Sequence, residues 1–135
     1  MKAALKYVGK SRYTLEDLKE IITILRAPDG CPWDREQTFD SLRSNTIEET
    51  YELADAITAH DMEAIKEELG DLLFSAVNVS RFVKVDAEEA LTAASDKFLL
   101  RFTEVEHMAA ERGIDMKTAG IETLDRLWDE AKLQK

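Results

Sequence analysis

Apolar side chains recur at helical spacing along most of the chain. In the stretch LEDLKEIITILR, residues 15–26, the apolar positions three or four residues apart are Leu15, Leu18, Ile21, Ile22 and Leu25. Similar spacing predicts further helices at about residues 38–59, 61–84, 86–113 and 121–133. No segment alternates apolar and polar residues with the period of a strand. The sequence therefore predicts an all-α fold, a bundle of about four to five helices.

Capping residues and helix breakers mark the ends of these predicted helices. Thr14 with Asp17 three residues later is typical of a capped helix start, and Asp86 with Glu89 gives the same signal. The densest cluster of Pro and Gly is APDGCPWD at residues 27–34, which predicts a loop.

Chain length and composition favour one domain. The 135 residues, 44% of them hydrophobic, suit a single domain over residues 1–135, in which residues 1–13 form a poorly ordered or loosely packed extension. The net charge of -10 argues against direct binding of nucleic acid or anionic membranes. No run is apolar enough for a signal peptide or a membrane span, and Cys31 has no second Cys to pair with. We expect a soluble cytoplasmic protein.

Two consecutive predicted helices carry acidic faces opposite their apolar ones. The acids of these faces are Glu48, Glu49, Glu52 and Asp55 in the second helix, and Glu67, Glu68 and Asp71 in the third. A short turn joins the two helices, so they are expected to be antiparallel neighbours. The two acidic faces can then meet.

An acidic face on an amphipathic helix usually meets water, and this interpretation stays open. Residues 44–65, however, contain no Lys or Arg. The like-charge pairs at helical spacing are Glu48/Glu52, Glu49/Glu52, Glu52/Asp55, Glu67/Asp71 and Glu68/Asp71. Their repulsion costs about 1 to 2.5 kcal/mol in total, which a bound divalent cation would reverse.

The residue types indicate which metal such a site would take. A di-iron centre needs two Glu-x-x-His pairs, and the sequence offers one, Glu104 with His107. His60 stands in a predicted turn, and we expect both histidines at the surface. A site made of carboxylates alone favours Mg²⁺, with Mn²⁺ as a substitute.

At these residues the sequence resembles the MazG nucleoside triphosphate pyrophosphohydrolases. Glu48-Glu49-x-x-Glu52, followed after fifteen residues by Glu68-x-x-Asp71, is similar to the family's EExxE…ExxD signature. That signature also occurs in dimeric dUTPases and phosphoribosyl-ATP pyrophosphohydrolases. The preceding segment GCPWDREQT, residues 30–38, makes the resemblance much more specific.

The resemblance implies a role for each matching residue. Glu49, Glu52, Glu68 and Asp71 would hold Mg²⁺, with Glu48 and Glu49 as the catalytic pair. The segments KFLLRFTEVE and LDRLWDEAK resemble the part of the family that handles the nucleotide. The substrate-binding residues by position would be Lys97, Arg101, Trp128, Lys132, Asn45 and Trp33.

Some of these residues have plainer interpretations or depart from the family pattern. Lys97 and Arg101 are also compatible with a charged surface pair, and Trp128 with a core position. Some relatives place a Lys at the position of Asn45. The loop at residues 30–38 and the tail usually mark different copies of the domain in two-domain relatives, whereas this chain carries both.

The implied function is hydrolysis of a (d)NTP at the α-phosphorus to the monophosphate and pyrophosphate. A narrower dUTP or dCTP pyrophosphatase and a non-catalytic helical dimer with a binding or regulatory role remain alternatives. The family forms dimers, sometimes dimers of dimers. We therefore expect a homodimer, possibly a tetramer, in which dimerisation completes the core.

Overall fold

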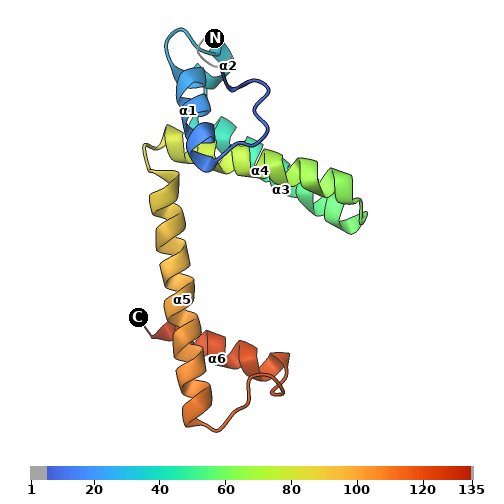
Figure 1. The fold of residues 1–135 in the computed structure, drawn as a ribbon, viewed down its shortest axis with the longest axis vertical. Helices are drawn as coiled ribbons and strands as arrows, with labels where there is room; N and C mark the ends of the chain where they lie inside the picture. The colour runs from blue at the N-terminus through green and yellow to red at the C-terminus, as the bar shows by residue number, and fades with distance from the viewer. Residues whose placement is uncertain (1–5, 135) are drawn as a thin grey trace. The chain divides into compact units, whose positions relative to one another are not determined.

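The computed structural model describes residues 6–134 as an all-α chain (Figure 1). Its helices are α1 (Leu15–Arg26), α2 (Pro32–Arg35), α3 (Phe39–Thr58), α4 (Met62–Phe82), α5 (Ala87–Glu111) and α6 (Ile121–Leu133). No residue between positions 6 and 134 belongs to a strand. The predicted all-α fold is confirmed, and the five longer helices begin and end close to their predicted bounds.

The predicted loop at residues 27–34 is wrong in its last part, where the single-turn helix α2 begins. Pro32 is its first residue, a position that suits proline because no backbone N–H is needed there and φ is already helical. The Arg35 N–H donates to the Cys31 carbonyl at 3.1 Å. A Pro that usually signals a break therefore starts a turn of helix.

The capping prediction for the first helix is confirmed. The Asp17 N–H donates to Thr14 Oγ1 at 3.1 Å, and the Thr14 N–H donates to Asp17 Oδ2 at 3.0 Å. These two bonds satisfy backbone donors that the first turn of a helix leaves free. At the fourth long helix, α5 begins at Ala87, directly after Asp86.

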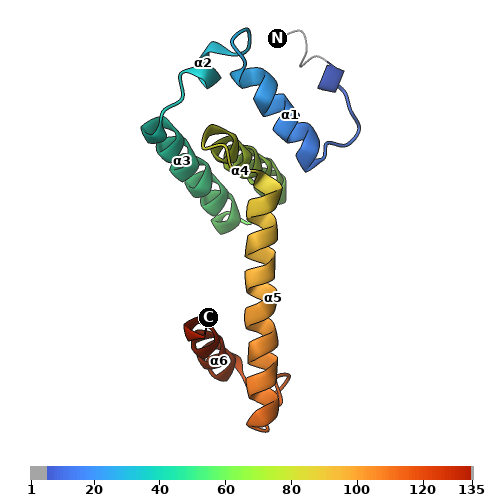
Figure 2. The ribbon, with the colours of Figure 1, turned by 90° about the vertical axis from the view of Figure 1, so that its left-hand side faces the viewer.

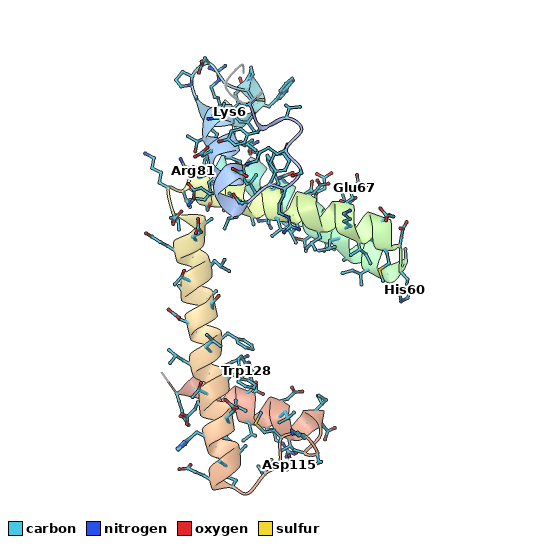
Figure 3. All side chains as sticks on the ribbon, viewed as in Figure 1. Lys6, His60, Glu67, Arg81, Asp115 and Trp128 are labelled. Atoms are coloured by element: carbon cyan, nitrogen blue, oxygen red, sulfur yellow. The ribbon has the colours of Figure 1, made fainter. Side chains whose placement is uncertain are left out.

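The chain divides into two compact units with the boundary after Ala87. In the first unit, α3 and α4 run side by side as an antiparallel pair, and α1 packs on α4 (Figures 1 and 2). His60 lies in the turn that joins α3 to α4 (Figure 3), and Asp61 caps α4 by accepting from the Ala64 N–H at 3.2 Å. The most buried large side chain of this unit is Ile22 on α1.

The second unit, from Glu88 onward, is a pair of helices, α5 and α6. Its buried side chains are Val105, Met108 and Ala109 from α5 with Leu127 and Ala131 from α6. The Arg112 guanidinium donates to both carboxylate oxygens of Glu130, at 3.0 and 2.7 Å, and joins the two helices at the surface.

The N-terminal extension predicted over residues 1–13 lies partly outside the described residues, which begin at position 6. In the described part, Tyr7 is buried and its carbonyl accepts a hydrogen bond from the Tyr13 hydroxyl. One domain over residues 1–135 stays a prediction. Across positions 6–134, we find no helix with both the length and the apolar character needed to cross a membrane.

Candidate metal and nucleotide site

Glu49, Glu68 and Asp71 come together where α3 and α4 lie side by side. One carboxylate oxygen from each of the three lies within 4.8 Å of the others. Glu68 and Asp71 stand three residues apart on α4, so they share a face, and the antiparallel pairing brings Glu49 of α3 opposite them. The predicted meeting of two acidic faces therefore occurs at these residues.

Burial sets this cluster apart from a solvated acidic surface. Glu49 Oε2 and Glu68 Oε2 are buried and have no hydrogen-bond partner. Burial is the main cause that raises the pKa of the Glu49 carboxyl group, and the carboxylates of Glu52 and Asp71 add to it. Burial also raises the pKa of Glu68 most, followed by interaction with the Glu52 carboxyl group. Keeping these acids ionised in the folded protein therefore costs free energy.

The cluster fits a hard divalent cation. A buried polar atom without a partner is rare in proteins and leaves its hydrogen-bonding capacity unused. Oxygen atoms within 4.8 Å of one another can all touch one ion, because Mg²⁺ and Ca²⁺ sit about 2.0–2.6 Å from their oxygen ligands. A cation here would also offset the repulsion between carboxylates, which adds to the effect of burial on the pKa values of Glu49 and Glu68. The acidic cluster can therefore hold a metal ion.

The remaining predicted metal and catalytic residues lie at the edge of this cluster. Glu52 neighbours Glu68 closely enough to shift its pKa. Glu48 is exposed, and its charge is a smaller cause of the raised pKa of Glu49. An exposed carboxylate beside the cluster keeps access to water.

Asn45 lies one turn before Glu49, and its side chain is used within the protein. Its Nδ2 donates to Ser75 Oγ at 2.9 Å, and Ser75 is buried. Because Ser75 follows Asp71 by four residues, this bond joins α3 to α4 one turn from the acidic cluster. Sequence reasoning missed Ser75, although its spacing from Asp71 places it on the same face of the helix.

Three of the predicted substrate-binding residues line one pocket in the second unit. Lys97 and Arg101 from α5 and Lys132 from α6 border a cavity of about 510 Å³. The other lining residues are Leu100, Glu104, Ala131 and Gln134. Glu104 and Gln134 were not assigned to the substrate site from the sequence, although Glu104 stands one turn beyond Arg101. The structure therefore brings the three cations to one pocket, and their role in substrate binding stays a prediction.

The two predicted tryptophans differ in their surroundings. Trp128 on α6 (Figure 3) is half-buried and packs against the core of the second unit. The centre of its ring lies 5.3 Å from the centre of the Phe98 ring. Its position matches the core interpretation and leaves part of the ring accessible. Trp33 on α2 is 78% exposed, so its indole faces solvent.

Both histidines are exposed, as expected. His107 lies 3.2 Å from Glu111 on the same helix, and His60 occupies the turn between α3 and α4. Neither belongs to the group of carboxylates that can hold a metal ion. The donor set of that group is oxygen alone.

The described residues are all-α, and their paired helices α3 and α4 bring together three carboxylates that could hold a metal ion. The model of the MazG nucleotide pyrophosphohydrolase domain matches residues 37–105, just over half of the chain. The chain therefore belongs to the MazG family, and the matched region contains the whole acidic cluster.

Curated relatives agree with this assignment. A nucleoside triphosphate pyrophosphohydrolase of Escherichia coli K12 is 38% identical over 126 residues, which cover 90% of this chain and 47% of that protein. A nucleoside triphosphate pyrophosphohydrolase/pyrophosphatase MazG of Thermotoga maritima is 45% identical over 81 residues, 60% of this chain and 32% of that protein. The uncharacterized protein YabN of Bacillus subtilis is 48% identical over 68 residues, 50% of this chain and 14% of that protein. The chain spans less than half the length of each of these relatives.

Proposed function

We propose that this protein hydrolyses nucleoside triphosphates, including deoxynucleoside triphosphates, at the α-phosphorus to give the nucleoside monophosphate and pyrophosphate. The observation that carries the proposal is the cluster of Glu49, Glu68 and Asp71, with two buried oxygens that lack partners. Family membership and the names of the relatives from Escherichia coli and Thermotoga maritima supply the reaction class.

Glu49, Glu52, Glu68 and Asp71 would hold the metal ion, which we propose to be Mg²⁺, with Mn²⁺ as a substitute. When bound, the ion supplies charge neutralisation at the phosphates and lowers the pKa of a coordinated water. The carboxylates of the site are ionised when they act as ligands. Because the pKa values of Glu49 and Glu68 are raised in the free protein, protons compete with the metal for these carboxylates more strongly than they would at an ordinary glutamate.

Glu48 is the proposed base or orienting group for the attacking water. Its carboxylate is exposed and lies next in sequence to the ligand Glu49. A general base needs access to the water and a position within hydrogen-bond reach of it. Glu49, in the middle of α3, would hold the metal.

Lys97, Arg101 and Lys132 are the proposed phosphate-binding cations. Their charges would stabilise the negative charge that develops on the leaving pyrophosphate. Trp128 would stack on the base with the accessible part of its ring, and Trp33 would contribute a second aromatic surface. Asn45 would act chiefly through its bond to Ser75, which fixes the spacing of α3 and α4.

A homodimer is part of the proposal. Large apolar side chains on α4 remain exposed, among them Leu69, Leu73 and Phe74. Patches of this kind are usual where two proteins meet. The proposed substrates belong to the cytoplasmic nucleotide pool, so the protein would act in the cytoplasm.

Product analysis tests the reaction. The protein is incubated with each common (d)NTP and Mg²⁺, and NMP, NDP, phosphate and pyrophosphate are separated. Formation of NMP with pyrophosphate supports the proposal, and restriction to dUTP or dCTP would narrow it. Release of NDP with phosphate, or no turnover by folded protein, contradicts it.

A further inference from the structure

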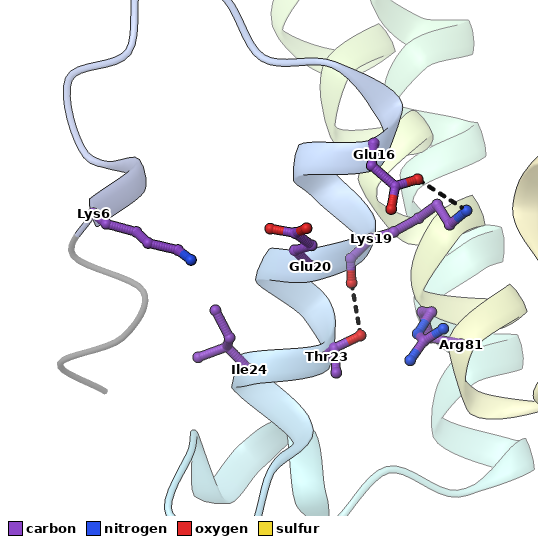
Figure 4. A pocket seen from close by; sticks show the side chains of 7 residues that line it. All are labelled: Lys6, Glu16, Lys19, Glu20, Thr23, Ile24 and Arg81. Carbon is purple, nitrogen blue, oxygen red and sulfur yellow. Dashed lines mark hydrogen bonds and ion pairs between the residues drawn. The ribbon is translucent and has the colours of Figure 1, made fainter.

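A second polar pocket lies on the first unit, bordered by α1, the end of α4 and the segment before α1 (Figure 4). Its volume is about 360 Å³, and its lining residues are Lys6, Glu16, Lys19, Glu20, Thr23, Ile24 and Arg81. None of these residues belongs to the acidic cluster or to the cation pocket of the second unit. The proposed reaction leaves this pocket unused.

One of its three cations is engaged within the protein. Lys19 Nζ lies 3.2 Å from a carboxylate oxygen of Glu16 and 2.5 Å from one of Asp86. Its own carbonyl accepts a hydrogen bond from the Thr23 hydroxyl at 2.8 Å (Figure 4). Lys19 therefore orders this wall of the pocket, and the carboxylates of Glu16 and Asp86 already balance its charge.

The other two cations are differently placed. Within residues 6–134, the structure gives the Arg81 guanidinium no hydrogen bond and no ion pair, although the residue is half-buried. Lys6 makes one side-chain contact there, with Nζ 5.2 Å from the centre of the Tyr7 ring. The sequence has 28 acidic residues against 18 basic ones, so the lack of an acidic partner for Arg81 does not come from a shortage of acids. A half-buried arginine whose guanidinium donors are unused beside a cavity is suited to an external acceptor.

The acid that remains sets a further condition on the ligand. Glu20 lines the same cavity, and the structure gives it no ion pair within the described chain. Its carboxylate accepts hydrogen bonds and repels a ligand that is anionic throughout. A ligand that satisfies both sides has an oxyanion at one end and hydroxyl or amino donors at the other.

We propose that this pocket binds a small phosphorylated molecule that carries hydroxyl or amino groups. The planar fork of Arg81 matches the paired oxygens of a phosphate group, and Lys6 adds a second positive charge. Glu20 accepts from the donors at the other end of the ligand. The cavity lies near the lower end of the 300–1,000 Å³ typical of small-molecule sites.

Residue-resolved NMR of the full chain tests this site. Amide spectra are recorded with EDTA present during titrations with inorganic phosphate, glycerol 3-phosphate and acetate. We expect the amides of Thr23 and Ile24 to shift with both phosphates, more weakly with acetate, and at lower concentration with glycerol 3-phosphate. Binding at the cation pocket of the second unit shifts other amides and is thereby distinguished.

Matched variants complete the test. Arg81→Gln should weaken phosphate binding at these amides about tenfold or more, because a charge-assisted hydrogen bond is lost. Lys6→Gln should weaken binding less, and Glu20→Gln should remove the advantage of glycerol 3-phosphate over inorganic phosphate. Arg43→Gln, at an exposed position on α3, is the control and should bind as the wild type does.

Three results would overturn the inference. The first is the absence of shifts at Thr23 and Ile24 with either phosphate. The second is unchanged binding in a folded Arg81→Gln protein, and the third is an equal loss in the Arg43→Gln control. If acetate binds as tightly as both phosphates, the site takes carboxylates and the assignment to a phosphorylated ligand is wrong.

Discussion

Glu49 on α3 and Glu68 on α4 present carboxylate oxygens within 4.8 Å of one another, and each keeps a buried oxygen without a hydrogen-bond partner. Two half-buried acids at this distance oppose folding when both are ionised. Their presence in the middle of a helix pair is explained if a cation completes the arrangement. The first two predictions follow from this pair.

Divalent metal should stabilise the protein through this pair. At a Mg²⁺ concentration about 100 times the Kd, ligand linkage contributes about 2.7 kcal/mol, which raises Tm by roughly 5–15 °C in a chain of this size. Thermal unfolding followed by circular dichroism, with EDTA or with Mg²⁺, measures the shift. Glu49→Gln should reduce the shift strongly, whereas the exposed control Glu106→Gln should keep it. An equal shift in both variants would show that the metal binds elsewhere.

In the metal-free protein, the contribution of Glu49 and Glu68 to stability should fall as the pH rises. The folded-state pKa values of Glu49 and Glu68 are raised above the ordinary Glu value of 4.5, so their ionised forms are disfavoured by folding. Their contribution is fully favourable below about pH 4.5 and is lost as the pH rises through the raised values. Urea unfolding in EDTA at several pH values, with wild type and the Glu49→Gln, Glu68→Gln double variant compared, isolates this contribution. The difference between the two should change with pH in this direction, and a difference independent of pH would contradict the raised pKa values.

The bond between Asn45 and Ser75 should stabilise the pairing of α3 and α4. Ser75→Ala leaves the Asn45 amide without its acceptor and should lower the free energy of unfolding by about 1–2 kcal/mol. A double variant with Asn45→Ala should lose less than the sum of the two single variants, since the partners act together. Strict additivity in urea unfolding would mean that the bond is absent in solution.

Much of the fold and of the acidic cluster is predictable from sequence, and particular residues show why. The periodicity of Leu15 to Leu25 predicts α1, and the i,i+3 spacing of Glu68 and Asp71 places both acids on one face. The start of α2 at Pro32 was missed because Pro signals both a break and a helix start. The unpaired Arg81 was missed because pairing depends on which segments pack beside it, a matter of tertiary contacts.

The core of the second unit should depend on Leu127. This side chain is 2% exposed, so Leu127→Ala should cost about 2–5 kcal/mol through lost burial and the cavity left behind. Leu133→Ala on the same helix is the matched control, because Leu133 is 85% exposed and should cost little. Urea midpoints of both variants measure the contrast, and similar midpoints would contradict the packing described for α5 and α6.

The cations of the 510 Å³ pocket should affect substrate binding. Arg101→Gln should raise KM for a nucleoside triphosphate about tenfold or more, because a charge-assisted contact to phosphate is removed. Lys117→Gln, an exposed change in the loop between α5 and α6, is the control. Steady-state kinetics with Mg²⁺ in excess compares the two, and unchanged kinetics for Arg101→Gln would remove this pocket from the substrate site.

The most direct test of the proposed reaction is the position of attack. Hydrolysis of a nucleoside triphosphate by the Mg²⁺-loaded protein is carried out in water enriched in ¹⁸O, and the products are analysed by mass spectrometry. Attack at the α-phosphorus predicts that one ¹⁸O atom appears in the nucleoside monophosphate and none in the pyrophosphate. Label in the pyrophosphate, or release of labelled phosphate, would contradict the account.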